Sequence, residues 1–301
     1  MNSFSSKACG RPPLKKRGTI TLHSPSKINL YLDIINKRKD GYHNIETVFQ
    51  KIDLFDKVKI AISEKEISLD CQSPHIPPYK SNLAYKAAFL MKEKFRLKEG
   101  IDIKIEKHIP VAAGLGGGSS DAASVIIGIN KLFKLRIDTK NLMRLGSRIG
   151  ADVPFLISNY SCALGKGIGD RLKQIRHANI FHVLLVVPQI RVYTKTIYSK
   201  ISLPLTKYSS SANISNYLLS HDKKVDKLTR CLYNRLEEVT LNLYPIVRKA
   251  KEKLSFYSEA ALVSGSGPTV FALFIKRKEA IKARDELMRD GRWQLLLAKT
   301  I

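Results

Sequence analysis

The stretch with the clearest chemical content runs from Pro110 to Asp121 and has the sequence PVAAGLGGGSSD. Its glycines can adopt positive φ angles and let a bulky ligand approach the main chain. Residues 101–107 alternate with period two, as in a strand, and the apolar residues after Asp121 follow helical spacing. The N–H groups and the dipole at a helix N-terminus favour an anion, so this pattern predicts a phosphate-binding loop.

A glycine-rich turn that only connects two elements is the plainer interpretation of this stretch, and the segment alone leaves it open. Two familiar phosphate motifs do not fit. The loop lacks the Gly-Lys-Ser/Thr ending of a Walker A motif, and no acid follows at the distance that a dinucleotide fold requires. The loop therefore indicates a phosphate without identifying the reaction.

Three other places carry side chains that could do chemistry. Lys27 and Asn29 lie two apart in an expected strand, on the face opposite its apolar residues, where a solvated edge is the favoured interpretation. Tyr42 and His43 follow an Asp-Gly hairpin signal and could stack on and hydrogen-bond a base, although ordinary turn residues are the plainer alternative. Asp152 stands among small and apolar residues, where an acid either caps a helix, the favoured interpretation, or serves chemistry.

The bulk composition limits the class of protein. The chain has 301 residues, of which 44% are hydrophobic, enough for one large or two ordinary globular domains. No apolar run reaches membrane length, and the start of the chain shows no signal-peptide pattern. The cysteines have no metal-ligand spacing, which argues against zinc and indicates reduced thiols in a cytosolic-type compartment. They are Cys9, Cys71, Cys162 and Cys231.

The chain is strongly basic, with 52 Lys and Arg against 26 Asp and Glu and a net charge of +26. Such a charge raises nucleic acid as a partner, and it equally suits an enzyme that handles polyphosphates. The basic residues are spread along the chain without interleaved aromatics, so a basic enzyme surface is the favoured interpretation.

The periodicity predicts elements on both sides of the glycine loop. Expected strands cover residues 19–23, 28–34, 58–62, 67–71, 101–107, 181–188, 260–263, 269–275 and 293–298. Expected helices cover residues 82–95, the segment after Asp121, and residues 138–149, 213–220, 230–241, 244–256 and 277–289. Pro154 is expected to stop the helix that Asp138 begins. The second half predicts a sheet covered on one side, and the whole chain an α+β fold.

Three segments, residues 25–30, 110–120 and 264–268, resemble in order and spacing the three motifs of the GHMP kinases, which include galactokinase, homoserine kinase, mevalonate kinase and phosphomevalonate kinase. Residues 40–43 (DGYH) and 150–155 (GADVPF) are similar to one branch of that superfamily. That branch phosphorylates a cytidyl diphosphate of methylerythritol in the non-mevalonate pathway to isoprenoid precursors.

The resemblance implies an α+β fold with two domains and an active site in the cleft between them. We expect a flexible basic leader over residues 1–18, an ATP-binding domain over 19–164 and a C-terminal domain over 165–301. Asp152 matches the general base that accepts the proton of the substrate hydroxyl, and Lys27 matches its charge partner. The residues that match the ATP-binding loop are Pro110, Gly114, Leu115, Gly116, Gly117, Gly118, Ser119 and Ser120.

The resemblance also implies how the substrate and a metal bind. Tyr42 and His43 match residues that stack on and hydrogen-bond the cytosine, and Tyr198 matches a second aromatic that closes over the base. The proline that the family often has near Thr194 is absent. The other substrate-binding candidates are Asn29, Gly265 and Gly267. Mg²⁺ accompanies ATP, with Ser119 or Ser120 as its protein ligand.

Two alternatives stay open beside this assignment. One is another small-molecule kinase of the superfamily, for homoserine or mevalonate, in which Tyr42 and His43 would have no role. The other is a basic nucleic-acid-binding protein on the same fold. For the favoured assignment we expect small-molecule partners, no nucleic acid or membrane, and a cytoplasmic location, or the plastid stroma in a plastid-bearing source. The sequence does not fix the oligomeric state.

Overall fold

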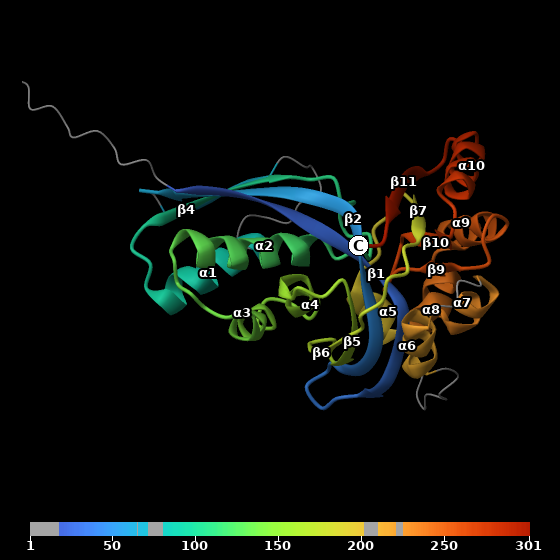
Figure 1. Ribbon diagram of the computed structural model, residues 1–301, viewed down its shortest axis with the longest axis horizontal. Helices are drawn as coiled ribbons and strands as arrows, with labels where there is room; N and C mark the ends of the chain where they lie inside the picture. The colour runs from blue at the N-terminus through green and yellow to red at the C-terminus, as the bar shows by residue number, and fades with distance from the viewer. Residues whose placement is uncertain (1–17, 65, 72–80, 202–209, 221–224) are drawn as a thin grey trace, which may run out of the picture.

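The computed structural model describes residues 18–64, 66–71, 81–201, 210–220 and 225–301, which form two sheets with their helices (Figure 1). The leader expected over residues 1–18 lies outside the described residues except for Gly18. The α+β class is confirmed, because mostly antiparallel strands carry helices packed against them.

Within the described residues the first sheet has seven strands, and two long ones form its centre. The strands are β1 (Thr19–Lys37), β2 (His43–Ser63), β3 (Ile67–Cys71), β4 (Gly100–Glu106), β5 (Cys162–Gly167), β6 (Arg171–Gln174) and β8 (Tyr233–Asn234). Their order is β3-β4-β2-β1-β8, while β5 pairs with β2 and β6 with β5. The Asp-Gly hairpin is confirmed, because it joins β1 to β2 with Lys37 opposite His43.

β1 corrects the expectation of two separate strands over residues 19–23 and 28–34. The pairing register with β2 shifts between Pro25 and Ser26, where the chain accommodates the proline in an irregularity of one continuous strand. Proline cannot donate to a ladder, so it is found at such places rather than within regular pairing. The strand expected over residues 58–62 is likewise only the far end of β2.

Four helices lie on one side of the first sheet (Figure 1). They are α1 (Leu83–Phe95), α2 (Gly117–Leu132), α3 (Thr139–Gly146) and α4 (Val153–Ile157). Asn82 and Asp138 cap α1 and α3 through their side chains, as expected. Pro154 does not stop a helix, because α3 already ends at Gly146 and the proline stands in the first turn of α4, where its missing N–H costs nothing.

The second sheet has the order β11-β7-β10-β9. Its strands are β7 (His182–Val187), β9 (Ala261–Val263), β10 (Val270–Phe274) and β11 (Gln294–Lys299). The helices of this half are α5 (Thr194–Ser199), α6 (Ser211–Leu219), α7 (Val225–Cys231), α8 (Arg235–Leu243), α9 (Pro245–Ser255) and α10 (Arg277–Met288).

The expectation that this sheet is covered on one side is wrong. Alternate residues of β7 enter two different cores. Leu184 and Val186 pack with residues of α9 and α10, whereas Val183 and Leu185 pack with residues of β1, β2 and α6. The second face is therefore buried against the first sheet, and one core joins the two parts of the molecule.

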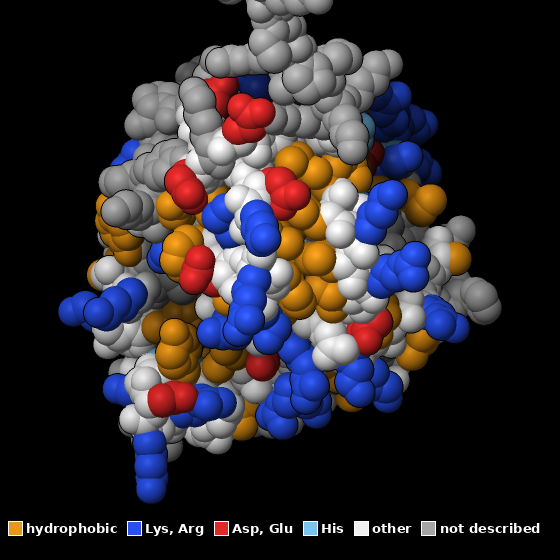
Figure 2. Space-filling view, turned by 90° about the vertical axis from the view of Figure 1, so that its left-hand side faces the viewer, with side chains coloured by type: hydrophobic (Ala, Val, Ile, Leu, Met, Phe, Trp, Pro, Cys, Tyr) orange, Lys and Arg blue, Asp and Glu red, His pale blue; other side chains and the backbone are white. Residues whose placement is uncertain are grey.

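The expected domain boundary between residues 164 and 165 lies within β5, and the first sheet also takes β8 from the second half of the chain, so the division into two domains at that point stays a prediction. The end of the molecule nearest β4 and α1 shows Lys and Arg side chains spread around an apolar area, with Asp and Glu between them (Figure 2). Across the described ranges, no helix has the length and apolar character needed to cross a membrane.

Candidate active site

The glycine loop has the strand–loop–helix geometry that its sequence predicts. It leaves β4 and enters α2 at Gly117, and Gly116 occupies the N-cap position with φ 72°. Gly114 also has a positive φ, 78°, and a Cβ placed there would lie 2.2 Å from the carbonyl oxygen of Ser264. The loop therefore needs glycine at residue 114 both for its backbone conformation and for close contact with the C-terminal half.

Lys27 is 4% exposed, so the solvated strand edge favoured from the pattern is wrong. Its ammonium group faces three acceptors. Nζ lies 2.7 Å from Asn29 Oδ1, 3.1 Å from the Gly114 carbonyl oxygen and 3.4 Å from Asp152 Oδ2. Its backbone N–H donates to the Leu115 carbonyl at 2.9 Å. The glycine loop thus covers β1 at Lys27 and fixes this residue through the Gly114 and Leu115 carbonyls.

Asp152 stands at the N-cap position of α4 but makes no capping hydrogen bond through its side chain. The capping interpretation is therefore wrong in the structure. The carboxylate faces Lys27 instead, and its side chain is 29% exposed. An ion pair with one buried member and one accessible member leaves an oxygen that a bound hydroxyl group can reach.

The two serines of the loop have different surroundings. The Ser120 hydroxyl is buried and donates to the Pro25 carbonyl at 2.6 Å, so it ties α2 to β1. Ser119 is partly exposed, and a Cβ at Gly150 would lie 3.8 Å from its Oγ. Ser119 therefore stands beside the turn that leads to Asp152, and of the two it is the serine that can reach a ligand.

The remaining loop residues divide into those that face the interior and those that do not. The Leu115 side chain belongs to the core between the sheets, and Gly117 is buried against Ile109. Gly118 is exposed, and Pro110 is partly exposed. Contact with a phosphate at Leu115 and Gly117 would thus have to come from the main chain.

A second glycine loop, between β9 and β10, meets the first. The Ser264 hydroxyl donates to the Gly114 carbonyl at 3.0 Å. A Cβ at Gly265 would lie 3.5 Å from Asn29 Oδ1 and 3.7 Å from Lys27 Nζ, so Gly265 borders the lysine. The Cβ position of Gly267 faces Thr240 and Val263, and its carbonyl oxygen would lie 3.1 Å from a Cβ at Gly114. Ser264 was not among the site residues predicted from the sequence. Its place within this loop motif is the only signal that could have indicated it.

Two of the three aromatic candidates, His43 and Tyr198, contact each other. The ring of His43, at the start of β2, lies 5.1 Å from the ring of Tyr198 in α5, tilted by 38°. Burial lowers the pKa of His43. Burial, followed by the nearby Asp152 carboxylate, raises the pKa of Tyr198, which places this phenol within the field of the catalytic candidate. Tyr42 is 62% exposed.

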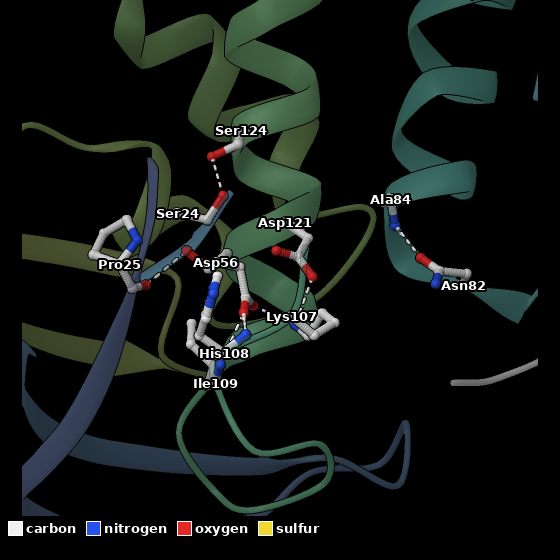
Figure 3. Close-up of polar contacts among 11 residues, drawn as sticks. Ser24, Pro25, Asp56, Asn82, Ala84, Lys107, His108, Ile109, Asp121 and Ser124 are labelled. Carbon is white, nitrogen blue, oxygen red and sulfur yellow. Dashed lines mark hydrogen bonds and ion pairs between the residues drawn. The ribbon is translucent and has the colours of Figure 1, made fainter. Parts of the chain in front are cut away.

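A buried charge cluster lies at the base of the glycine loop, and no sequence pattern indicated it (Figure 3). The Lys107 ammonium contacts the Asp56 carboxylate and lies 2.8 Å from Asp121 Oδ2. Asp56 Oδ1 also accepts from the N–H groups of His108 and Ile109, at 2.6 and 2.8 Å. Burial raises the pKa of Asp121 to about 7, although Lys107 opposes this shift. The cluster ties β2 and the segment after β4 to the second turn of α2.

Within the part of the chain that the structure describes, no group of three or more His, Cys, Asp or Glu side chains could hold a metal ion. What the site offers is a buried ammonium, a partly exposed carboxylate and a loop of main-chain N–H groups at a helix N-terminus. This arrangement can hold a polyphosphate beside a group that accepts a proton.

Comparisons with known proteins agree with this arrangement. Residues 82–160 match the GHMP kinases N terminal domain, and residues 220–291 match the GHMP kinases C terminal domain. The 4-diphosphocytidyl-2-C-methyl-D-erythritol kinase of Acetivibrio thermocellus is 40% identical over 285 residues, 94% of this chain and 99% of that protein. The enzyme of the same name from Clostridioides difficile is 40% identical over 274 residues, 90% of this chain and 92% of that protein.

Solved structures give the same result. A crystal structure of 4-(cytidine 5'-diphospho)-2C-methyl-D-erythritol kinase superposes with a TM-score of 0.76 and 29% identity, covering 93% of this chain and 99% of the other. The homoserine kinase of Cytophaga hutchinsonii has a TM-score of 0.73 at 16% identity, over 98% of this chain and 97% of its own, and that likeness shows the fold alone.

Proposed function

We propose a reaction mechanism for this chain, which belongs to the 4-diphosphocytidyl-2-C-methyl-D-erythritol kinases of the GHMP family. The protein is an ATP-dependent small-molecule kinase. It phosphorylates a hydroxyl group of 4-diphosphocytidyl-2-C-methyl-D-erythritol, to give the 2-phosphate, in the non-mevalonate pathway to isoprenoid precursors.

The observation that carries the chemistry is the pair of Lys27 and Asp152, 3.4 Å apart beneath the glycine loop. Asp152 accepts the proton of the substrate hydroxyl group. At the same time the oxygen of that hydroxyl group forms the new bond to the γ-phosphorus of ATP. The bond from that phosphorus to the bridging oxygen breaks, and ADP leaves with the electron pair. Lys27 stabilises the negative charge beside the transferred group, since its ammonium is fixed and largely shielded from water.

The glycine loop supplies the phosphate-binding part of this site. Its main-chain N–H groups and the N-terminus of α2 suit the charge of ATP. For Mg²⁺, the partly exposed hydroxyl of Ser119 is the fitting ligand, because Ser120 is occupied by Pro25. A magnesium ion that arrives with ATP takes only one or two protein ligands, and it would neutralise charge on the phosphate oxygens.

Recognition of the cytosine is assigned to the aromatic residues. Tyr42 is accessible for stacking, and His43 lies against Tyr198 within the electrostatic reach of Asp152. A base bound against these rings would gain stacking on a face and hydrogen bonds on its edge. Cys71, Cys162 and Cys231 are free thiols in the structure, in keeping with a reducing compartment, and we propose the cytoplasm.

An ATP-consumption assay across three acceptors tests the proposal. The cytidyl diphosphate of methylerythritol should be phosphorylated in the presence of Mg²⁺, and mevalonate and homoserine should not. Turnover of mevalonate or homoserine alone would replace the proposed substrate with that of another GHMP kinase. RNA binding that weakens steeply with salt, without any ATP turnover, would instead support the nucleic-acid alternative.

A further inference from the structure

We propose that Thr47 is a positioning residue for Lys27 and acts through the side-chain amide of Asn29. The inference rests on the proposed kinase function, in which Lys27 contacts the transferred group. Thr47 lies on β2, fully buried, and it was not among the residues that the sequence pointed to.

The three side chains form a continuous buried chain of hydrogen bonds. Lys27 Nζ donates to Asn29 Oδ1 at 2.7 Å. Asn29 Nδ2 donates to Thr47 Oγ1 at 2.9 Å, and Thr47 Oγ1 donates to the Tyr31 carbonyl oxygen at 2.7 Å. Asn29 is 1% exposed, and both polar atoms of its amide have protein partners. Asn29 therefore serves the lysine, and the substrate contact that the family resemblance implies stays a prediction.

The direction of each hydrogen bond in this chain is fixed by chemistry. A hydroxyl group has a single proton, and the Tyr31 carbonyl can only accept, so that proton points to Tyr31. Thr47 Oγ1 must then accept from Asn29, which forces the N–H₂ end of the amide toward Thr47. The oxygen end consequently faces Lys27. Thr47 thus orients the Asn29 amide so that the Lys27 ammonium faces its oxygen, an acceptor, and not its N–H₂ group, a donor.

The orientation matters because the other groups around Lys27 do not fix its position alone. Nζ also faces the Gly114 carbonyl and Asp152, and it lies 5.8 Å from the ring centre of Phe49. Of all these contacts of Nζ, the one to Asn29 is the shortest. Without a fixed amide, the ammonium would lose that anchor and shift between the loop and the carboxylate, and misplacement by about 1 Å can cost about 100-fold in rate.

Thr47→Val tests the proposal, because valine keeps the shape of threonine and removes the hydroxyl group. The expected result is a kcat about 10- to 100-fold lower, with the KM for ATP within about twofold of wild type. Thr47→Ser restores the hydroxyl group and should recover most of the kcat. Ser124→Ala is the matched control: it removes the buried partner of Ser24, in the same half of the molecule but away from Lys27, and should lower stability without lowering kcat.

A double variant separates positioning from a general loss of structure. In Asn29→Ala the amide is gone, so adding Thr47→Val should lower kcat no further. Multiplied losses would overturn the proposal, as would a Thr47→Val enzyme with wild-type kcat or a Thr47→Ser enzyme as impaired as Thr47→Val. If Thr47→Val is too unstable to assay, Thr47→Ala and Thr47→Ser give the same comparison.

The wild-type enzyme separates failure of this inference from failure of the proposed function. If it does not phosphorylate the cytidyl substrate, the proposed function is wrong. The Thr47 variants are then compared on the acceptor that the wild type does use. The positioning role of Thr47 and the substrate assignment are thereby tested independently.

Discussion

The Gly114 carbonyl oxygen accepts a hydrogen bond from the Ser264 hydroxyl group at 3.0 Å, although the two residues stand 150 positions apart in the chain. The same oxygen also accepts from Lys27 Nζ. One main-chain atom therefore joins the glycine loop, Lys27 and the C-terminal loop. All three acceptors of Lys27 come before β5 in the chain, and the C-terminal loop contacts one of them, the Gly114 carbonyl.

This close contact predicts that Gly114→Ala destabilises the protein. A Cβ at residue 114 would meet the Ser264 carbonyl at 2.2 Å and would strain a backbone with φ 78°. We expect a loss of about 1–3 kcal/mol in the free energy of unfolding, measured by urea denaturation. Gly118→Ala is the control, because its Cβ meets only Leu83 at 3.9 Å and alanine favours the helix there by up to about 1 kcal/mol. Equal stabilities for the two variants would contradict the contact.

Asp152→Asn is predicted to abolish most turnover while the fold remains. The side chain makes no capping bond to α4, and Lys27 keeps its contacts to Asn29 and Gly114. A general base contributes about 10²–10⁴-fold, so kcat should fall by that factor, measured by ADP release at saturating substrates.

A capping aspartate provides the opposite pattern to Asp152→Asn. Asp138→Ala removes a side-chain cap from α3 and should cost about 0.5–2 kcal/mol of stability with kcat unchanged. Full activity in Asp152→Asn would remove Asp152 from the role of base.

Tyr42→Ala is predicted to weaken binding of the cytidyl substrate alone. Stacking of a base on an aromatic ring contributes about 1–3 kcal/mol, so the KM for that substrate should rise about 5- to 150-fold. The KM for ATP and the stability should stay near wild type, since Tyr42 is exposed. Phe256→Ala removes an even more exposed aromatic at the end of α9 and should change neither KM. An unchanged substrate KM in Tyr42→Ala would favour a homoserine or mevalonate kinase.

The parts of the structure that the sequence predicted are those that local chemistry decides. The helix starts at Asn82 and Asp138 follow from side-chain caps, and the Asp-Gly hairpin follows from its turn residues. The glycine loop precedes α2 because the residues after it have helical spacing. In each case the deciding partners lie within a few positions along the chain.

The parts that escaped prediction depend on partners far away in the chain. Lys27 has the pattern of a solvated edge, and only the covering loop at Gly114 shows that it is buried. Asp56 is one of three acids in a long strand, and its role requires Lys107, 51 positions later. Thr47 is one threonine among the alternating residues of β2, and its partner Asn29 lies on the neighbouring strand. Alternation gives the face of a strand but not what covers that face.

Lys51 provides a prediction about stability and pH that does not involve the reaction. Its ammonium group is buried, donates to the Ser158 carbonyl at the C-terminus of α4 and lies 5.2 Å from the ring centre of Phe155. Burial lowers the pKa of Lys51 from 10.5 to about 8. The charged form therefore costs the folded protein about 3 kcal/mol, in full below pH 8.

The sign of the pH dependence follows from which state holds the proton. Between pH 8 and about 10.5 the folded protein has released the proton of Lys51 while the unfolded chain still binds it, so this group makes stability rise with pH. Lys51→Met removes that contribution. The stability of the variant relative to wild type should thus be about 3 kcal/mol more favourable at pH 7 than near pH 10.5, measured by urea denaturation at both values. Lys59→Met, on the exposed side of the same strand, should leave the pH dependence as in wild type, and an equal response of the two variants would show that burial of Lys51 has no such cost.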